Sequence, residues 1–434
     1  MPHTSSSPAN HAHLLGLAGR AYRCQCGCPV FFRNSICLAC RTPLGYDPGQ
    51  ARLLPLKPGN EPDTWVAWDA DEGAPAFLRC SNLRTPAACN WLVPVTAGQT
   101  QGLLCRACQL NRTIPDLNDP EHPDNGVLWG RVELAKRRLV SALLVLGLPL
   151  TSRVSEDPHS GLMFDFLRSP DYGPHILTGH DTGLITLNLN EADDATREAV
   201  RKAMHEPYRT LLGHLRHEVG HYYWDRLVAG GPWLDPFRML FGDETQDYAS
   251  SLRANYDEGP RPDWALHYVS AYASVHPWED WAECWAHYLH MRDTVDTALS
   301  FGLSPDIAQL EFTAFTLDAL YEPDHPEAES FLAFLNHWTQ LTTMLNEMSR
   351  AMGQPDFYPF VLPHEVVAKL HFIHLLVSSV GTTVADERAP EAAMDEQTEV
   401  VDAPAEVTLA QEGEQEQVQG QQTGQQKMQG QSWS

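Results

Sequence analysis

The feature that most constrains this chain is a glutamate flanked by two histidines inside a strongly periodic segment. His217 and His221 stand four residues apart around Glu218, within the run HLRHEVGHYY. On an α-helix, residues at i and i+4 lie on one face about one turn apart, so both imidazoles can bind one ion. Neutral imidazoles are common zinc ligands, and the glutamate projects beside the metal, where it can deprotonate a zinc-bound water. The pattern therefore predicts a helix that holds zinc.

A catalytic zinc site needs a third protein ligand, and the segment HPWEDWAECWAHYLH offers carboxylates for this role. Glu279 and Glu283 share one helical face among several tryptophans, where an unpaired charge would be costly to bury. We assign Glu279 as the ligand and Glu283 as the acceptor for the free N–H of a ligand imidazole. The reverse order stays open. Asp280 points elsewhere and suits the start of the helix, where a carboxylate favours the dipole.

Other polar residues near these helices have structural alternatives. His214 precedes His217 by three residues, and a packing or surface role is favoured over a ligand role. Asp225 is placed either to orient His221 or at the surface. An acidic block between the two helices has the spacing of a helix start, which favours a cap over a role beside the metal. This block contains Asp243, Glu244 and Asp247.

Cysteines mark residues 21–118, which contain nine of the ten in the chain. Thiolates in close pairs on turns are typical of tetrahedral zinc sites in small, loop-rich modules, so we expect one or two structural zinc ions. The first predicted set is Cys24, Cys26, Cys37 and Cys40. Cys28 competes for the place of Cys24 or Cys26, although Gly27 after Cys26 favours the set as given. The second predicted set, with buried free thiols as the alternative, is Cys80, Cys89, Cys105 and Cys108.

Composition and periodicity predict an α+β fold that is mostly helical. The expected stretches are a flexible leader (1–20), one or two zinc-ribbon modules (21–118), a large helical domain (125–380) and a disordered Gln- and Glu-rich tail (381–434). Helical periodicity is expected over Val132–Leu146, Pro207–Leu227, Pro277–Asp293, Pro305–Tyr321, Glu327–Met352 and Pro363–Val380. Lys136, Arg137 and Arg138 should form a basic outer face on the first helix. The alternating run Gly183–Asn190 predicts a strand, either an edge that pairs with an extended peptide or ordinary sheet core.

Longer blocks of the sequence resemble a known family. The motif HExxH and, some 58 residues later, ExxxE resemble the gluzincin metallopeptidases. Over about residues 20–375 the chain is similar to a bacterial family of zinc-binding metallopeptidases with an N-terminal zinc ribbon. The blocks that carry this likeness are GLITLN, PYRTLLGHLRHEVGHYYWDRL, FGDETQDYASSL and HPWEDWAECWAHYLH.

The resemblance implies a zincin-like domain over 125–380 that hydrolyses peptide bonds in a peptide or protein substrate. A zinc-bound water would attack, with Glu218 as the general base. In gluzincins the first glutamate of the second motif is the metal ligand, which supports Glu279. In lethal-factor-type gluzincins a tyrosine seven residues before that glutamate assists the oxyanion. Here this position is Tyr272, for which a core tyrosine is the alternative.

The acidic balance narrows the range of partners. A net charge of −26 argues against broad binding to nucleic acids or anionic membranes, although part of this charge lies in the tail. No secretory signal and no apolar run long enough to span a bilayer is visible, so we expect a cytoplasmic protein. The competing interpretation is a zinc-ribbon adaptor whose zincin domain holds metal without turnover. The oligomeric state stays open.

Overall fold

The computed structural model describes residues 19–95, 103–170, 172–173, 175–204, 206–304 and 310–388, with side chains up to residue 381. The expected leader, apart from its last two residues, and the tail beyond residue 388 lie outside the described residues. Among the described residues, no helix is both long and apolar enough to cross a membrane. The fold is α+β and mostly helical, which confirms the class expected from the sequence.

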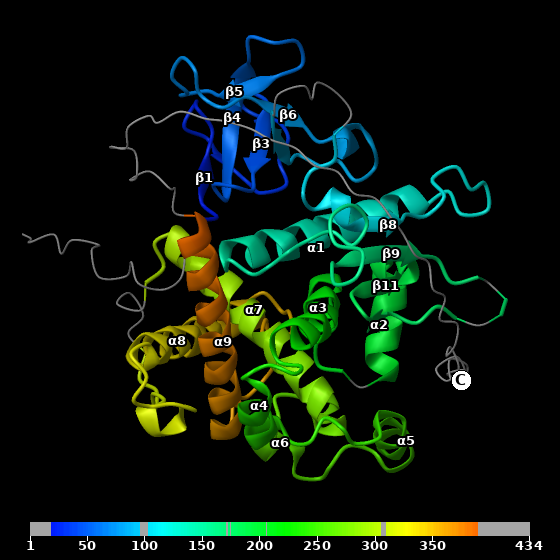
Figure 1. Ribbon diagram of the computed structural model, residues 1–434, viewed down its shortest axis with the longest axis vertical. Helices are drawn as coiled ribbons and strands as arrows, with labels where there is room; N and C mark the ends of the chain where they lie inside the picture. Colours follow the sequence, from blue (N-terminus) through cyan, green and yellow to red (C-terminus); the bar gives the residue numbers. More distant parts are fainter. Residues whose placement is uncertain are drawn as a thin grey trace, which may run out of the picture.

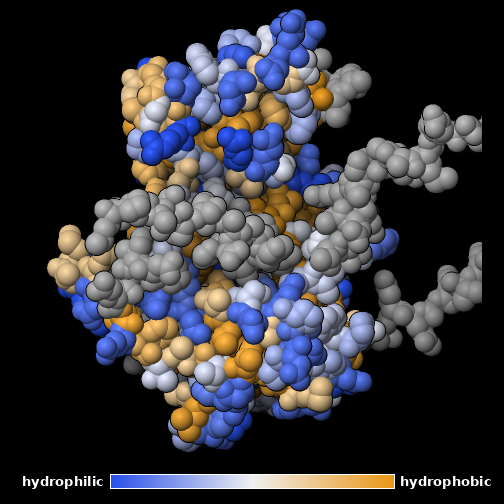
Figure 2. Space-filling model, turned by 90° about the vertical axis from the view of Figure 1, so that its left-hand side faces the viewer, coloured by the Kyte–Doolittle hydropathy of each residue, from blue (hydrophilic) through white to orange (hydrophobic). Residues whose placement is uncertain are grey.

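The Cys-rich segment forms a small β-rich lobe, drawn in blue at the top of Figure 1 and set above the larger body in the side view of Figure 2. β1 (Tyr22–Arg23) and β2 (Pro29–Val30) form an antiparallel pair. The next strands form an antiparallel sheet in the order β3-β4-β5-β6-β7. Their bounds are β3 (Leu44–Asp47), β4 (Arg52–Pro58), β5 (Trp65–Ala67), β6 (Phe77–Arg79) and β7 (Leu92–Pro94).

A second sheet, in the order β10-β11-β9-β8, belongs to the larger body. Its strands are β8 (Asn111–Thr113), β9 (Met163–Leu167), β10 (Gly179–Asp181) and β11 (Leu184–Asn188). β11 alternates as predicted, with Ile185 and Leu187 buried. It pairs with β10 on one side and β9 on the other, so it is sheet core and the edge interpretation is wrong. β8 is the last strand of the Cys-rich segment and pairs with β9. The Cys-rich segment therefore supplies a strand to the main sheet.

Helices make up most of the larger body. The α-helices are α1 (Asn125–Val145), α2 (Asp194–Ala203), α3 (Leu211–Leu227), α4 (Leu234–Phe241), α5 (Tyr248–Glu258), α6 (Trp264–His267), α7 (Pro277–Ser300), α8 (Ala328–Ala351) and α9 (His364–Arg388). Short 3-10 helices are η1 (Ser81–Arg84), η2 (Cys108–Leu110), η3 (Leu189–Ala192), η4 (Tyr272–Val275) and η6 (Leu317–Ala319).

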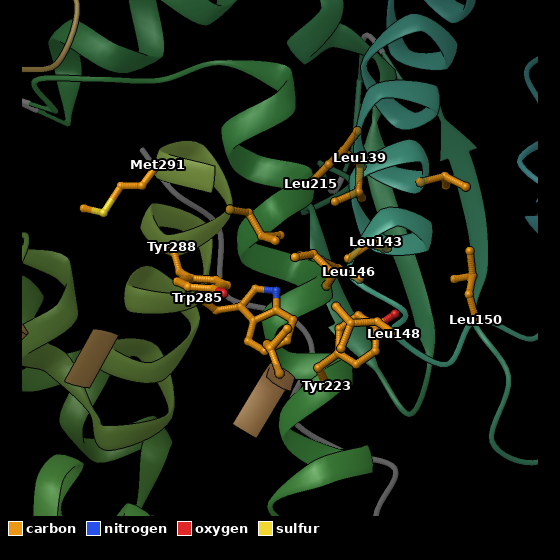
Figure 3. Packing of buried hydrophobic residues seen from close by; sticks show 14 of the residues in the cluster. Leu139, Leu143, Leu146, Leu148, Leu150, Leu215, Tyr223, Trp285, Tyr288 and Met291 are labelled. Carbon is orange, nitrogen blue, oxygen red and sulfur yellow. The ribbon is translucent and has the colours of Figure 1, made fainter. Parts of the chain in front are cut away.

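Close packing of α3 against α7 forms the centre of the core. Tyr223 of α3 and Trp285 of α7 lie next to each other in Figure 3, with ring centroids 5.0 Å apart and ring planes inclined by 26°. A Cβ added to Gly220 would lie 3.1 Å from the Cα of Ala282 and 3.2 Å from Trp285. The missing side chain therefore lets the two helix backbones approach. This approach brings the histidine-bearing face of α3 against the start of α7.

Several helix boundaries differ from the sequence prediction. α3 begins at Leu211 and not at Pro207, because Thr210 caps it by accepting a hydrogen bond from Gly213 N–H at 3.0 Å. The helix expected over 305–321 is wrong for the described residues 310–321, which hold only η6. There the side chain of Asn336 binds both the N–H and the carbonyl of Phe315, at 2.9 and 3.1 Å. The other helices start or end a few residues away; α7 runs on to Ser300 and α9 to Arg388.

The basic outer face expected on α1 is also wrong. Lys136 is fully buried, with Nζ 2.8 Å from Glu133 Oε1 and a further hydrogen bond to Asn111. Arg137 is 3% exposed and donates to the carbonyl of Ala87 at 2.9 Å. α1 therefore lies between the Cys-rich lobe and the rest of the body, as Figure 1 shows. Its basic residues find partners across that junction, which helical periodicity alone does not reveal.

Asp293 in α7 forms ion pairs with three arginines from distant parts of the chain. Its carboxylate lies 3.0 Å from Arg20 Nη2, 2.6 Å from Arg138 Nε and 2.8 Å from Arg216 Nη2. Burial raises the pKa of Asp293, but the three guanidinium groups outweigh it and hold that pKa far below its usual value. Arg20, which the sequence placed at the end of a flexible leader, is therefore anchored to the body.

We expect Asp293→Ala to destabilise the protein by about 3–5 kcal/mol, because three largely buried guanidinium groups lose their shared counter-charge. Urea unfolding followed by tryptophan fluorescence measures the loss. Asp356→Ala is the matched control, because it removes the partner of Arg350 at the surface, 2.7 Å away. That exposed pair should contribute little. Equal losses in the two variants would contradict the role of the cluster.

Two buried histidines should make the stability depend on pH. Burial lowers the pKa of His287 and of His371 to about 4, because an imidazolium would lose its hydration there. In the unfolded chain both titrate near 6.5, so unfolding takes up protons between these values. Their contribution is complete above about pH 6.5 and is lost as the pH falls toward 4. We expect a loss on the order of 1 kcal/mol per group between about pH 7 and pH 5.5, measured by urea unfolding. The free energy of unfolding of His371→Leu should fall less than that of the wild type over the same pH range. An identical fall in the two proteins would contradict the role of His371.

Candidate metal centre

Three ligand atoms converge where the middle of α3 faces the first turn of α7. His217 Nε2 lies 3.2 Å from His221 Nε2 and 3.0 Å from Glu279 Oε2, and the third separation, His221 Nε2 to Glu279 Oε2, is 3.6 Å. A tetrahedral zinc ion with ligands at about 2.0–2.1 Å would hold them roughly 3.4 Å apart. Glu279 Oε2 is buried and receives no hydrogen bond within the described part of the chain. The donor set and its spacing therefore fit zinc.

Glu283 holds the far side of the His217 ring. Its Oε1 lies 2.8 Å from His217 Nδ1, and its Oε2 accepts a hydrogen bond from Ser270 Oγ at 2.6 Å. A proton on Nδ1 leaves the lone pair of Nε2 free for a metal. Burial lowers the pKa of His217, but the adjacent carboxylates of Glu279 and Glu283 outweigh it and raise that pKa well above 6.5. Glu279 thus lies among the converging ligand atoms and Glu283 on the far side of the His217 ring. That Glu279 binds the metal stays a prediction.

His221 is covered by an aromatic ring and is not oriented by the carboxylate suggested for it. The ring centroid of Trp278 lies 3.9 Å from that of His221. His221 Nδ1 is buried and has no partner among the described residues. Asp225 instead lies 4.0 Å from His180 Nε2, and its side chain is 42% exposed.

Glu218 follows His217 on α3 and is 5% exposed. Its Oε1 lies 3.4 Å from His214 Nε2. Burial raises the pKa of Glu218, but His214 and the two ligand imidazoles outweigh it and hold that pKa below its usual value. An ionised carboxylate beside the ligand atoms is suited to accept a proton. His214 itself lies outside the ligand group.

The acidic residues near the two helices have structural roles. Asp280 is fully buried and pairs with Lys369 Nζ at 2.7 Å, so the expectation that it caps α7 is wrong. His276 is the cap, and its Nδ1 accepts from Trp278 N–H at 3.1 Å. Asp247 caps α5, as the helix-start spacing of its block predicts. The other two acidic residues of that block bind Thr245 and Arg238.

The Cys-rich lobe holds two further ligand groups. They comprise Cys24, Cys26, Cys37 and Cys40 in one, and Cys80, Cys89, Cys105 and Cys108 in the other. The sulfur atoms of Cys24 and Cys40 lie 3.5 Å apart, and those of Cys26 and Cys37 lie 3.8 Å apart. In the second group the sulfur atoms of Cys89 and Cys105 lie 3.6 Å apart. These distances are close to the roughly 3.8 Å of a tetrahedral zinc thiolate site. Gly27 turns the chain with a φ of 82°, and Cys28 stays outside the group. Cys284 is a buried thiol of the core.

Comparison with known protein families matches both parts of the chain. The family described as "Putative zinc-binding metallo-peptidase" matches residues 125–376. The chain belongs to this family. A zinc-ribbon domain matches residues 21–119. These matches confirm the resemblance drawn from the sequence blocks.

The names of the similar proteins describe no reaction. Uncharacterized proteins of Mycobacterium bovis and of two Mycobacterium tuberculosis strains are each 41% identical over 375 residues, which cover 86% of this chain and 97% of each relative. No solved structure matches the chain. In this member of the zinc-binding metallopeptidase family, the roles of individual residues are therefore inferred from the geometry of its own site.

Two tyrosines complete the surroundings of the centre. The ring centroid of Tyr272, in η4, lies 6.0 Å from that of His217. Tyr248, at the start of α5, donates a hydrogen bond to Glu279 Oε1 at 2.7 Å. Burial and the charge of Glu279 raise the pKa of both tyrosines, so both keep their protons at neutral pH. Sequence reasoning missed Tyr248; the available signal is its place in the block FGDETQDYASSL, directly after Asp247.

Proposed function

We propose that this protein is a zinc metallopeptidase that hydrolyses peptide bonds, with Glu218 as its general base. The observation that carries the proposal is the convergence of the His217, His221 and Glu279 ligand atoms beside an ionised Glu218. Zinc at this site would supply Lewis acidity to a scissile carbonyl and make a water molecule acidic enough to lose a proton near neutral pH. Membership of the zinc-binding metallopeptidase family supports the same chemistry.

Different side chains of the site transfer the proton, stabilise the developing charge and orient the ligands. Glu218 takes a proton from the attacking water and returns it to the leaving amine. Tyr272, assigned by resemblance, keeps an O–H that can donate to the developing oxyanion. Tyr248 donates to Glu279 Oε1, which orients the other oxygen of that carboxylate toward the two imidazoles. Glu283 accepts a hydrogen bond from His217 Nδ1 and so orients the His217 ring.

An extended peptide or protein segment is the proposed substrate, and we place it along β10. This strand pairs only with β11 among the described strands, so one of its edges is free to add another strand. The ring centroid of His180, in β10, lies 6.3 Å from that of His221, which brings this edge close to the centre.

The two cysteine groups are proposed to hold structural zinc. β8, which directly follows the second group, pairs with β9 of the main sheet, so this group would stabilise the larger body as well as its own lobe. Cysteine-based metal sites and free thiols favour a cytoplasmic location, where thiols stay reduced. The acidic charge disfavours nucleic acid as a partner.

An adaptor that holds metal without turnover is the second candidate, and a peptide-library digest separates the two. The full-length protein is tested zinc-loaded, after removal of metal with a chelator, and after zinc is restored, with products read by mass spectrometry. We expect cleavage in the first and third samples only. No cleavage in any sample would favour the adaptor, and cleavage that persists without metal would contradict a zinc mechanism.

A further inference from the structure

We infer that His214, anchored by Glu191, is a positioning residue for Glu218. The inference rests on the proposed function, in which Glu218 is the base. His214 stands on α3 one turn before Glu218, and its ring lies between two carboxylates. Its Nδ1 is 2.7 Å from Glu191 Oε2, and its Nε2 is 3.4 Å from Glu218 Oε1.

Glu191 is itself firmly placed. It lies in η3, directly after β11, and is 9% exposed. Thr178 Oγ1 donates to its Oε1 at 2.5 Å, and Arg209 Nη2 lies 3.4 Å from its Oε2. A carboxylate this deeply buried is stable only with such partners. Glu191 therefore ties the His214 ring to the end of the main sheet.

The geometry determines what His214 does to Glu218. Both ring nitrogens of His214 face carboxylate oxygens, so each nitrogen serves as a donor. The donor at Nε2 faces Oε1 of Glu218 and leaves Oε2 for the attacking water. A glutamate side chain has several rotamers, and a donor that faces one oxygen favours the rotamer seen here. Because 3.4 Å is long for a hydrogen bond, the contact steers the carboxylate without locking it.

A purely structural ion pair is the alternative role for His214 and Glu191. It would stabilise the junction of α3 with the sheet and leave the placement of Glu218 unaffected. The two roles differ in any measurement that reports on the base and not on folding. Such a measurement needs no peptide substrate.

Binding of acetohydroxamate to the zinc-loaded full-length protein provides that measurement. A hydroxamate binds zinc through its two oxygens and passes its hydroxyl proton to a nearby base, so its affinity, read by calorimetry, reports on Glu218. We expect His214→Leu to weaken binding about tenfold and Glu191→Gln about threefold, with zinc content unchanged. His214→Gln should recover most of the affinity, because its amide can replace the Nε2 donor.

His267→Leu is the matched control. His267 makes the same 2.7 Å contact through Nδ1, with Glu365, but on α6. This variant should bind acetohydroxamate like the wild type. A loss of affinity there equal to that of His214→Leu would show a general effect of losing such a pair and would overturn the inference.

The remaining outcomes are equally decisive. Unchanged affinity in His214→Leu and Glu191→Gln, together with a lower melting temperature, would assign the structural role. Loss of zinc in these variants would place the effect at the metal ligands and would also overturn the inference. If His214→Leu does not fold, Glu191→Gln and His214→Gln decide. Normal hydroxamate binding that depends on His214, without any peptide cleavage, would refute the proposed function and leave the positioning role intact.

Discussion

Glu279→Ala is expected to lose the metal of the His217–His221 centre, whereas Glu283→Ala is expected to keep it with about 10–100-fold weaker affinity. Glu279 supplies one of three converging ligand atoms, so its loss leaves two imidazoles, too few for a stable zinc site. Glu283 acts only through His217 Nδ1, so its loss frees the ring to rotate but removes no ligand.

Metal analysis after dialysis against a graded series of chelator concentrations measures both effects. The two cysteine groups are an internal control, because their zinc should stay in either variant. One zinc ion per chain should therefore be missing from Glu279→Ala and none from Glu283→Ala at low chelator concentration. The opposite pattern would exchange the roles of the two glutamates.

Glu218→Gln is expected to keep its zinc and to lose about a thousandfold or more in kcat. Glutamine has nearly the same shape but cannot accept the proton of the attacking water. Because none of the three converging ligand atoms belongs to Glu218, metal content should match the wild type. The measurement compares zinc content and the rate of peptide cleavage in the same preparation.

Glu244→Gln is the control for this substitution. Glu244 lies between α3 and α7 in the sequence, and it pairs with Arg238 away from the ligand group. Its conversion should leave the cleavage rate near that of the wild type. A loss of less than tenfold in Glu218→Gln would mean that another group activates the water, and the assignment of the base would then be wrong.

The Cys-rich lobe is more closely joined to the larger body than two independent domains would be. β8 adds a strand to the main sheet, Lys136 binds Asn111, and Arg137 donates to the carbonyl of Ala87. The hydroxyl of Tyr46, in β3, lies 2.6 Å from Ser141 Oγ of α1. Disruption of the second cysteine group should therefore destabilise the larger body as well.

Local features of the site were predictable from the sequence. The four-residue spacing of His217 and His221 is meaningful because 3.6 residues complete a helical turn. The close spacing of the cysteines likewise marks metal knuckles, and the same sets converge in the structure. Helix α8 was located to within one residue at each end, because its apolar positions recur strongly along the segment.

Other features depend on parts of the chain that are far apart. Lys136 and Arg137 look like a solvated face until the Cys-rich lobe covers them. The run around Phe315 has helical periodicity, but Asn336 satisfies its backbone groups from another helix. Tyr248 and Glu279 are 31 residues apart, and His214 and Glu191 are 23 apart, so no local pattern connects them.

By itself, the sequence determined that a helix presents two imidazoles and a carboxylate, that a second helix carries two glutamates, and that two groups of four cysteines are available. These follow from backbone geometry within a few residues. Only the tertiary structure decided which glutamate faces the imidazoles, which tyrosine binds it and which histidine faces the base. Those contacts arise because Gly220 lets α3 approach α7 and because the chain after β11 returns Glu191 to α3, and such packing depends on the whole fold.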